Sequence, residues 1–168
     1  MPATTTQEAV LLNIRDMLRG ASIASIAASA DAAIYISTTP HLTADHDAFV
    51  QIVPGSIETQ FPTSGLGLIE AEFAVVSWVH RALDYHGRGD YLVAKDAGSD
   101  ADPVLTLAKS VRAHLINYED ATNSTRIIAI PVRHLGASEP QRYDGENGWW
   151  ASVSERYMVG FVGWSAAG

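Results

Sequence analysis

Residues 66–83 read LGLIEAEFAVVSWVHRAL, and this stretch decides the fold class of the 168-residue chain. The odd positions are Ile69, Ala71, Phe73, Val75, Ser77 and Val79, and the even positions include Glu70, Glu72, Trp78 and His80. A period of two is typical of a β-strand with one face on a core and the other facing water or a partner. About 16 residues at about 3.3 Å each would reach on the order of 50 Å, whereas an ordinary strand has about 5–6 residues. We therefore expect part of this strand to project beyond the core.

A helix is predicted near the start of the chain. Thr5 and Glu8 have the spacing of a capping box, in which each side chain satisfies a backbone N–H of the first turn. Gly20 is predicted to end this helix, because glycine commonly follows the last helical residue. The apolar stripe between them consists of Val10, Leu11, Ile14, Met17 and Leu18. Residues 21–33, rich in Ala and Ser, are compatible with either a short second helix or irregular structure.

A second helix is predicted from Asp102 and Pro103, because Asp is a good N-cap and Pro fits the first helical position. Its apolar stripe consists of Val104, Leu107, Ala108, Val111 and Leu115.

The remaining predicted strands are short or flank loops. Residues 34–36 and 48–53 are predicted strands, and Pro54-Gly55 is predicted to end the second of them before a connection over residues 57–67. Further strands are predicted at residues 125–132, with Pro131 marking an edge or an end, and at residues 149–164, on either side of a loop at 136–148.

Two helices among several strands, without βαβ alternation, favour an α+β fold. We expect a mostly antiparallel β-sheet with two main helices packed on one face and one long projecting strand. The chain, residues 1–168, is predicted to be a single domain, since no linker or internal repeat divides it.

Composition excludes several classes of function. The hydrophobic fraction of 47% and the charged fraction of 18% are those of an ordinary globular protein. The net charge of −8 argues against a basic nucleic-acid-binding face. The absence of cysteine excludes thiol nucleophiles, disulfides and Cys-ligated zinc. The first residues do not resemble a secretory signal, and residues 21–36 are too short and polar to span a membrane, so we expect a soluble protein made without export.

No convergent catalytic set is apparent. His41 and His46, beside Asp45 and Asp47, lie in a Pro-containing loop without metal-site spacing, so a solvated loop is the favoured interpretation. The sequence contains no Gly-x-Ser-x-Gly motif and no phosphate-binding glycine loop. We therefore predict no catalytic, cofactor-binding or metal-binding residues.

Other features favour a contact surface over a reactive site. Glu70 and Glu72 would lie about 7 Å apart on one strand face, which suits a charged surface better than two-carboxylate chemistry. Trp149 and Trp150 would point to opposite sheet faces, so at least one must be covered. Either the chain's own core or a subunit interface, where Trp is enriched, would cover it.

The order of segments resembles the tail terminator (tail completion) proteins of long-tailed bacteriophages. The resemblance rests on the capped N-terminal helix, the strand FVQIVPG at residues 49–55, the long strand 66–83, the helix 102–118 and the closing strand ERYMVGF at residues 155–161. It is a match of architecture and patterning over most of the chain.

The resemblance implies a structural virion protein and not an enzyme. Family members form a ring of six subunits that caps the head-proximal end of the tail tube, stops its polymerisation and offers a surface to the head–tail connector. The protein would be made in the host cytoplasm and reside in the virion. DNA would pass through the ring without specific binding, which suits an acidic chain because a cationic lumen would bind phosphates. Candidate contact residues toward a subunit or the tube are Glu70, Glu72, Trp78, Trp149 and Trp150.

Two alternatives remain open at this point. One is another structural part of the same particle, such as a neck or tail-tube protein. The other is a small hydrolase or isomerase that uses an acid–base pair around His80, Asp84 and His86.

Overall fold

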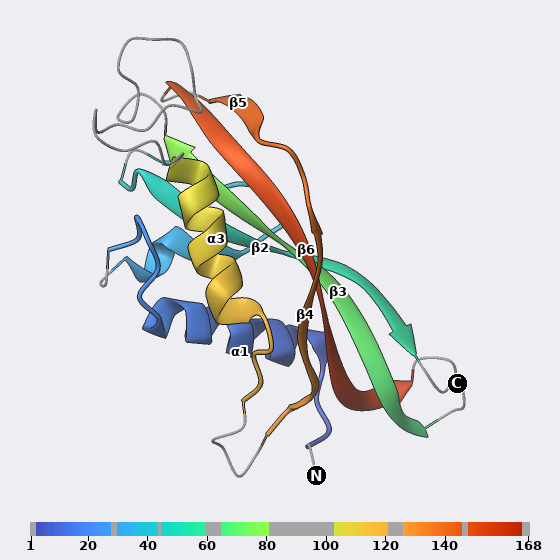
Figure 1. Cartoon of the computed structure of the whole chain (residues 1–168). Helices are drawn as coiled ribbons and strands as arrows, with labels where there is room; N and C mark the ends of the chain where they lie inside the picture. The colour runs from blue at the N-terminus through green and yellow to red at the C-terminus, as the bar shows by residue number, and fades with distance from the viewer. Residues whose placement is uncertain are drawn as a thin grey trace.

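The computed structural model describes residues 3–27, 30–43, 45–59, 65–80, 103–120, 126–145 and 148–165. In chain order the elements are α1 (Gln7–Gly20), a 3-10 turn η1 (Asp31–Ala33), β1 (Ile34–Ile36), β2 (Ala48–Thr59), β3 (Gly65–His80), α3 (Pro103–Leu115), β4 (Ile128–Ala137), β5 (Gln141–Gly145) and β6 (Gly148–Ser165). The sheet runs β1-β2-β3-β6-β4, and β5 pairs with β6. Only the β1–β2 pair of these named strands is parallel. The predicted α+β fold with a mostly antiparallel sheet is confirmed (Figure 1).

The long strand predicted from alternation is β3, which pairs with β6 along its whole length, from Gly65 opposite Ser165 to His80 opposite Trp150. The helices α1 and α3 pack on the same face of the sheet, since their buried residues join one core cluster with those of β2, β3 and β6. We call this the inner face and the opposite face the outer face. The predicted core positions of β3 are all buried on the inner face: Ile69, Ala71, Phe73, Val75, Ser77 and Val79.

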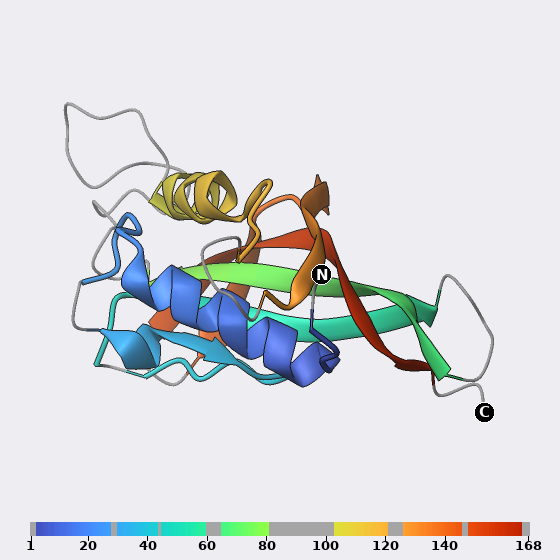
Figure 2. The same ribbon diagram turned by 90° about the horizontal axis from the view of Figure 1, so that it is seen from below.

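One end of the sheet extends past both helices in Figures 1 and 2. We call this end the arm, and it consists of residues 56–59 of β2, 65–70 of β3 and 162–165 of β6. The rest of the described chain is called the body. The arm matches the predicted projecting strand, and it contains the ends of three strands instead of one.

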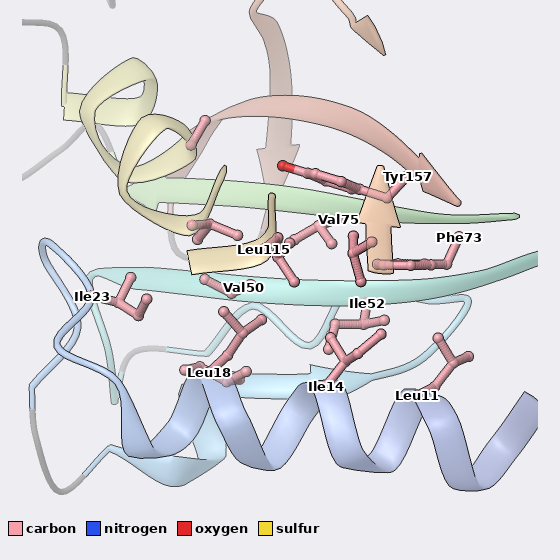
Figure 3. Packing of buried hydrophobic residues seen from close by; sticks show 14 of the residues in the cluster. Leu11, Ile14, Leu18, Ile23, Val50, Ile52, Phe73, Val75, Leu115 and Tyr157 are labelled. Atoms are coloured by element: carbon pink, nitrogen blue, oxygen red, sulfur yellow. The ribbon is translucent and has the colours of Figure 1, made fainter. Parts of the chain in front are cut away.

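The main core lies between the inner face and the two helices. Figure 3 shows Leu11, Ile14 and Leu18 of α1 directed toward the side chains of β2 and β3. The predicted stripe of α3 is also buried: Val104, Leu107, Ala108, Val111 and Leu115. Phe73 stacks on Tyr157 of β6, with ring centroids 5.5 Å apart. Since both rings are almost fully buried, this pair anchors the centre of the body.

The start of α1 differs from the prediction by one residue. The N-cap is Thr6, whose Oγ1 accepts a hydrogen bond from the backbone N–H of Ala9 at 3.2 Å. Thr5 is instead held outside the helix, because its N–H donates to the carbonyl oxygen of Val162 at 2.8 Å. This contact with β6 fixes where the chain enters the helix. In residues 21–33 the structure has no α-helix among the described residues, only the turn η1.

The predicted end of a strand at Pro54-Gly55 is wrong, since β2 continues to Thr59. Pairing of β2 with β1 ends at Ile52. Proline has no backbone N–H to donate, but no β1 residue lies beside Pro54, so no hydrogen bond of the sheet is lost there. A bulge follows between Pro54 and Ile57. A Cβ added at Gly55 would lie 2.4 Å from the carbonyl oxygen of Glu72, so only glycine permits this approach of the two strands.

The predicted loop at residues 136–148 is also wrong in part, because it contains β5, which forms a hairpin with β6. The strand predicted at 125–132 begins at Ile128 and continues to Ala137. Pro131 does lie in an edge strand of the sheet, where three register shifts interrupt β4. Residues 81–102, including Asp84, His86 and the predicted cap Asp102, lie outside the described residues.

Candidate interaction surface

The two predicted carboxylates, Glu70 and Glu72, lie on the outer face of β3 and are partly buried. Glu70 Oε1 is 3.1 Å from Nη2 of Arg133 on β4, and Glu72 Oε1 is 3.4 Å from Nε of Arg156 on β6. The two ion pairs therefore join β3 to β4 and β3 to β6 on the outer face. Exposed pairs of this kind contribute little to stability, typically 0–1 kcal/mol. Their main effect is to make this part of the outer face polar.

Trp78 lies on the outer face as predicted, but the chain itself covers it. Its side chain is 7% exposed, its Nε1–H donates to Oε1 of Gln51 at 3.0 Å, and its ring meets Tyr143 of β5 edge-on at 5.5 Å. Trp150 is 1% exposed, with its ring centroid 5.5 Å from that of Phe49. The cover comes from β5 and from the segment around η1, which builds a second apolar cluster of Ala30, Ala33, Phe49, Trp78 and Trp150.

Of the two neighbouring tryptophans, Trp149 remains partly exposed. The guanidinium carbon of Arg142 on β5 lies 4.7 Å from the centroid of its ring, a cation–π distance. Trp150 is therefore covered by the chain's own core and not by a subunit interface. Trp149 is the member of the pair that a partner could still reach.

The histidines form no metal site among the residues that the structure describes, which hold no group of three or more His, Cys, Asp or Glu side chains suited to an ion. His41 Nε2 lies 3.0 Å from the Ser37 hydroxyl, and the His46 ring packs edge-on against Phe49. His80 packs against Trp150 at 4.7 Å between ring centroids. Its proposed acid–base partners, Asp84 and His86, belong to the segment that the structure does not describe.

A buried charged cluster joins α3 to β6 and β4. Arg112 Nε donates to Oε1 of Glu155 at 2.9 Å, and the Tyr157 hydroxyl donates to Oε2 of the same carboxylate at 2.8 Å. His134 Nε2 lies 3.6 Å from Oε1 of Glu155. Glu155 is 2% exposed, so the donors of Arg112 and Tyr157 replace the water that it loses on folding.

The electrostatics of this cluster favour a structural role. Burial, and then the hydrogen bond to Glu155, raise the pKa of Tyr157 far above its usual value. The hydrogen bond to Glu155 also raises the pKa of Arg112. Because both groups keep their protons throughout the physiological range, neither suits proton transfer at neutral pH. The cluster holds α3 against the sheet.

The arm carries apolar side chains that the pattern analysis did not select. Among the described residues the three most exposed large hydrophobic side chains are Trp164 at 69%, Leu66 at 54% and Ile57 at 51%, and all lie in the arm. Leu66 is directly opposite Trp164 on the outer face. The signal was present in the sequence, since Leu66 and Leu68 occupy even positions of β3 that turn acidic at Glu70.

Acidic groups border the apolar patch formed by Leu66 and Trp164. Glu58 of β2 lies directly opposite Glu70 of β3, which places two carboxylates side by side on the outer face. Residues 54–80 contain three glutamates and neither Lys nor Arg. The arm therefore combines exposed apolar surface with local negative charge, a combination suited to a partner that offers apolar surface and a cation.

No protein-family model matches the chain, and no curated protein sequence is significantly similar to it. Within the part of the chain that the structure describes, none of the helices has both the length and the apolar character needed to cross a membrane.

Proposed function

We propose that the chain is a structural subunit of a phage tail and not an enzyme: a terminator that assembles into a ring at the head-proximal end of the tail tube. The observation that carries this proposal is the arm, where Leu66 and Trp164, each more than half exposed, lie side by side on the outer face at one end of the molecule. Ile57, opposite Ala71, adds a further exposed apolar side chain on the inner face of the arm. Exposed apolar groups gathered in one place are typical of an interaction site. The predicted fold, now seen in the structure, also agrees with the resemblance to this family.

The partners of the ring follow from the same proposal. Six copies of the chain would form it, the tail tube protein would meet one side, and the head–tail connector would meet the other. The net charge of −8 would keep the lumen from binding the phosphates of passing DNA. The subunit would be made in the host cytoplasm and become part of the virion.

Native mass spectrometry with a tube-capping assay tests this function. We expect the wild-type chain to form hexamers on its cognate tail tubes and to restore tail length in a terminator-defective phage. Trp164→Ser is expected to lose both activities. Ile116→Ser is the matched control, since Ile116 is 42% exposed on the body. A wild-type chain that stays monomeric with tubes present, and neither caps them nor restores tail length, would overturn the proposal.

A further inference from the structure

We propose that the arm of one copy docks into the groove between α1 and β1 of a second copy. This inference rests on the ring-forming function proposed above and names the surface that receives the arm. The groove has a volume of about 440 Å³, and its lining includes one acidic residue, Glu8, beside Leu12, Arg15, Arg19, Tyr35 and Ile36. The residues that line the groove belong to the body, whereas the arm projects from one end of the sheet (Figure 2).

The groove borders an open edge of the sheet. β1 is the terminal strand, and no described strand pairs with it on the side away from β2. Arg19 of α1 donates from Nε and Nη2 to the carbonyl oxygen of Ile34, at 3.0 and 2.7 Å, and so covers the beginning of this edge. The edge beyond Ile34 continues along the groove at Ile36. Such an edge is a ready site for another chain.

On the opposite side of the sheet, the edge at β4 is unsuited to the same role. β4 contains Pro131, which lacks a backbone donor, and three register shifts interrupt its pairing with β6. Irregularities of this kind protect an edge strand from pairing with other chains. Of the edges at β1 and β4, the one at β1 is therefore the more receptive.

Charge complementarity identifies the arm as the occupant. Glu58 and Glu70 face each other across β2 and β3, an arrangement of like charges that is unfavourable unless a cation joins it. Arg133 provides one guanidinium group, to Glu70. The groove offers a second at Arg15, whose own partner is the exposed carboxylate of Asp16 at 2.8 Å. An exposed pair of this kind is weak, so Arg15 can exchange Asp16 for Glu58 of another copy.

The apolar surfaces also correspond. Leu66 and Trp164 stand beyond the acidic pair, at the far end of the arm. Leu12 and Ile36 supply partly buried apolar surface in the groove beside Arg15. Docking would remove the most exposed apolar side chains from water while the carboxylates meet guanidinium groups.

Arm and groove are different surfaces of the same chain, so the contact is heterologous. Each copy would give its arm to one neighbour and receive the arm of another. Contacts of this type generate a ring when the rotation between copies closes. The proposed contact would therefore close the assembly without leaving the apolar surface of the arm unused.

Disulfide trapping tests the contact directly, because the chain has no native cysteine. Leu66→Cys and Leu12→Cys proteins are mixed with cognate tail tubes and oxidised. We expect a cross-linked dimer that contains one copy of each variant. Leu66→Cys mixed with Ile116→Cys, on the exposed surface after α3, is the control and should give no cross-link above background. Cross-linking of Leu66→Cys to itself in preference to Leu12→Cys would indicate an isologous contact and overturn the proposal.

A charge exchange gives a second, independent readout. Glu58→Arg and Arg15→Glu are each expected to weaken assembly about tenfold, equivalent to about 1.4 kcal/mol, and the double variant is expected to recover most of the loss. If rings form normally but neither the Leu66–Leu12 cross-link nor this recovery is seen, the groove contact is overturned while the proposed ring-forming function stands. A wild-type chain that forms no ring on tubes would overturn both proposals.

Discussion

Two parts of β3 share one strand and one alternation, yet their outer-face side chains have different surroundings. In the body, Trp78 is only 7% exposed, because β5 and the segment around η1 cover it. In the arm, Leu66 is 54% exposed on the same face. Alternation specifies which face a side chain occupies, but another part of the chain decides whether that face is covered. The uncovered apolar part is the one that we assign to a partner.

The largest expected effect comes from emptying the core of the body. Phe73→Ala removes a ring that is 1% exposed and stacked on Tyr157. Loss of the ring and the cavity left behind should lower the free energy of unfolding by about 4 kcal/mol, measured by urea denaturation. A loss below about 1 kcal/mol would show that the body collapses around the gap, and would weaken the contrast between body and arm.

A second prediction concerns the junction of the body and the arm. A Cβ at Gly160 would lie 2.6 Å from Cβ of Ile130 on β4, closer than real side chains approach. Gly160→Ala should therefore lower the free energy of unfolding by about 2 kcal/mol through overpacking. Gly136→Ala is the matched control on β4, since nothing lies within 4 Å of its added Cβ. Equal thermal shifts in the two variants would contradict this packing argument.

The third prediction is a loss of stability at alkaline pH that belongs to the body. The pKa of Tyr157 is raised in the folded state above its usual value of 10.0, mainly by burial. Above about pH 10 the unfolded chain releases this proton while the folded chain keeps it. Stability is therefore constant below that pH and falls above it, by up to about 1.4 kcal/mol per pH unit for this group.

Urea denaturation between pH 8 and pH 11 measures this effect. Tyr157→Phe should cost about 1 kcal/mol at neutral pH through its lost hydrogen bond and should reduce the alkaline slope. Tyr35 and Tyr118, whose pKa values burial also raises, contribute to the slope that remains. Tyr143→Phe, at an exposed ring, is the control. An unchanged slope in Tyr157→Phe would refute the assignment.

The smallest expected effect is in the arm. Leu66→Ala and Trp164→Ala alter side chains that are mostly in water, so the free energy of unfolding of the isolated chain should change by less than about 0.5 kcal/mol. Calorimetry of the single chain checks this. A destabilisation of about 2 kcal/mol or more would mean that the arm supports the fold itself, and would remove the reason to treat its apolar surface as a contact site.

Several elements were predictable because their residues repeat with one clear period. The alternation at Ile69, Phe73 and Val79 and the helical stripes of α1 and α3 each describe a single buried face, and local geometry converts such a pattern into an element. β2 beyond Pro54 was not predictable in this way. Proline and glycine usually end a strand, and only the absence of β1 beside Pro54 and the nearness of Glu72 to Gly55 allow β2 to continue.

The residues of the candidate surface also differ in how far the sequence predicts their position. Glu70 and Glu72 were selected correctly as outer-face groups, since alternation alone gives that result. Trp78 was selected by the same alternation, and Trp150 because two adjacent tryptophans must point to opposite faces of a sheet. Their burial depends on the segment around η1 and on β5, a strand that the sequence pattern assigned to a loop. The exposed patch at Leu66 and Trp164 depends on the pairing of two segments that are about a hundred residues apart in the chain.

By itself, the sequence determined which residues can share a strand or helix face, because that property depends only on the repeat of the backbone and on neighbouring residues. It also determined the acidic balance and the absence of thiol chemistry. Tertiary structure alone decided which faces are covered, which carboxylates meet arginines and where the arm leaves the body. These features arise from contacts between distant segments, whose free energy is absent from any local stretch of the chain.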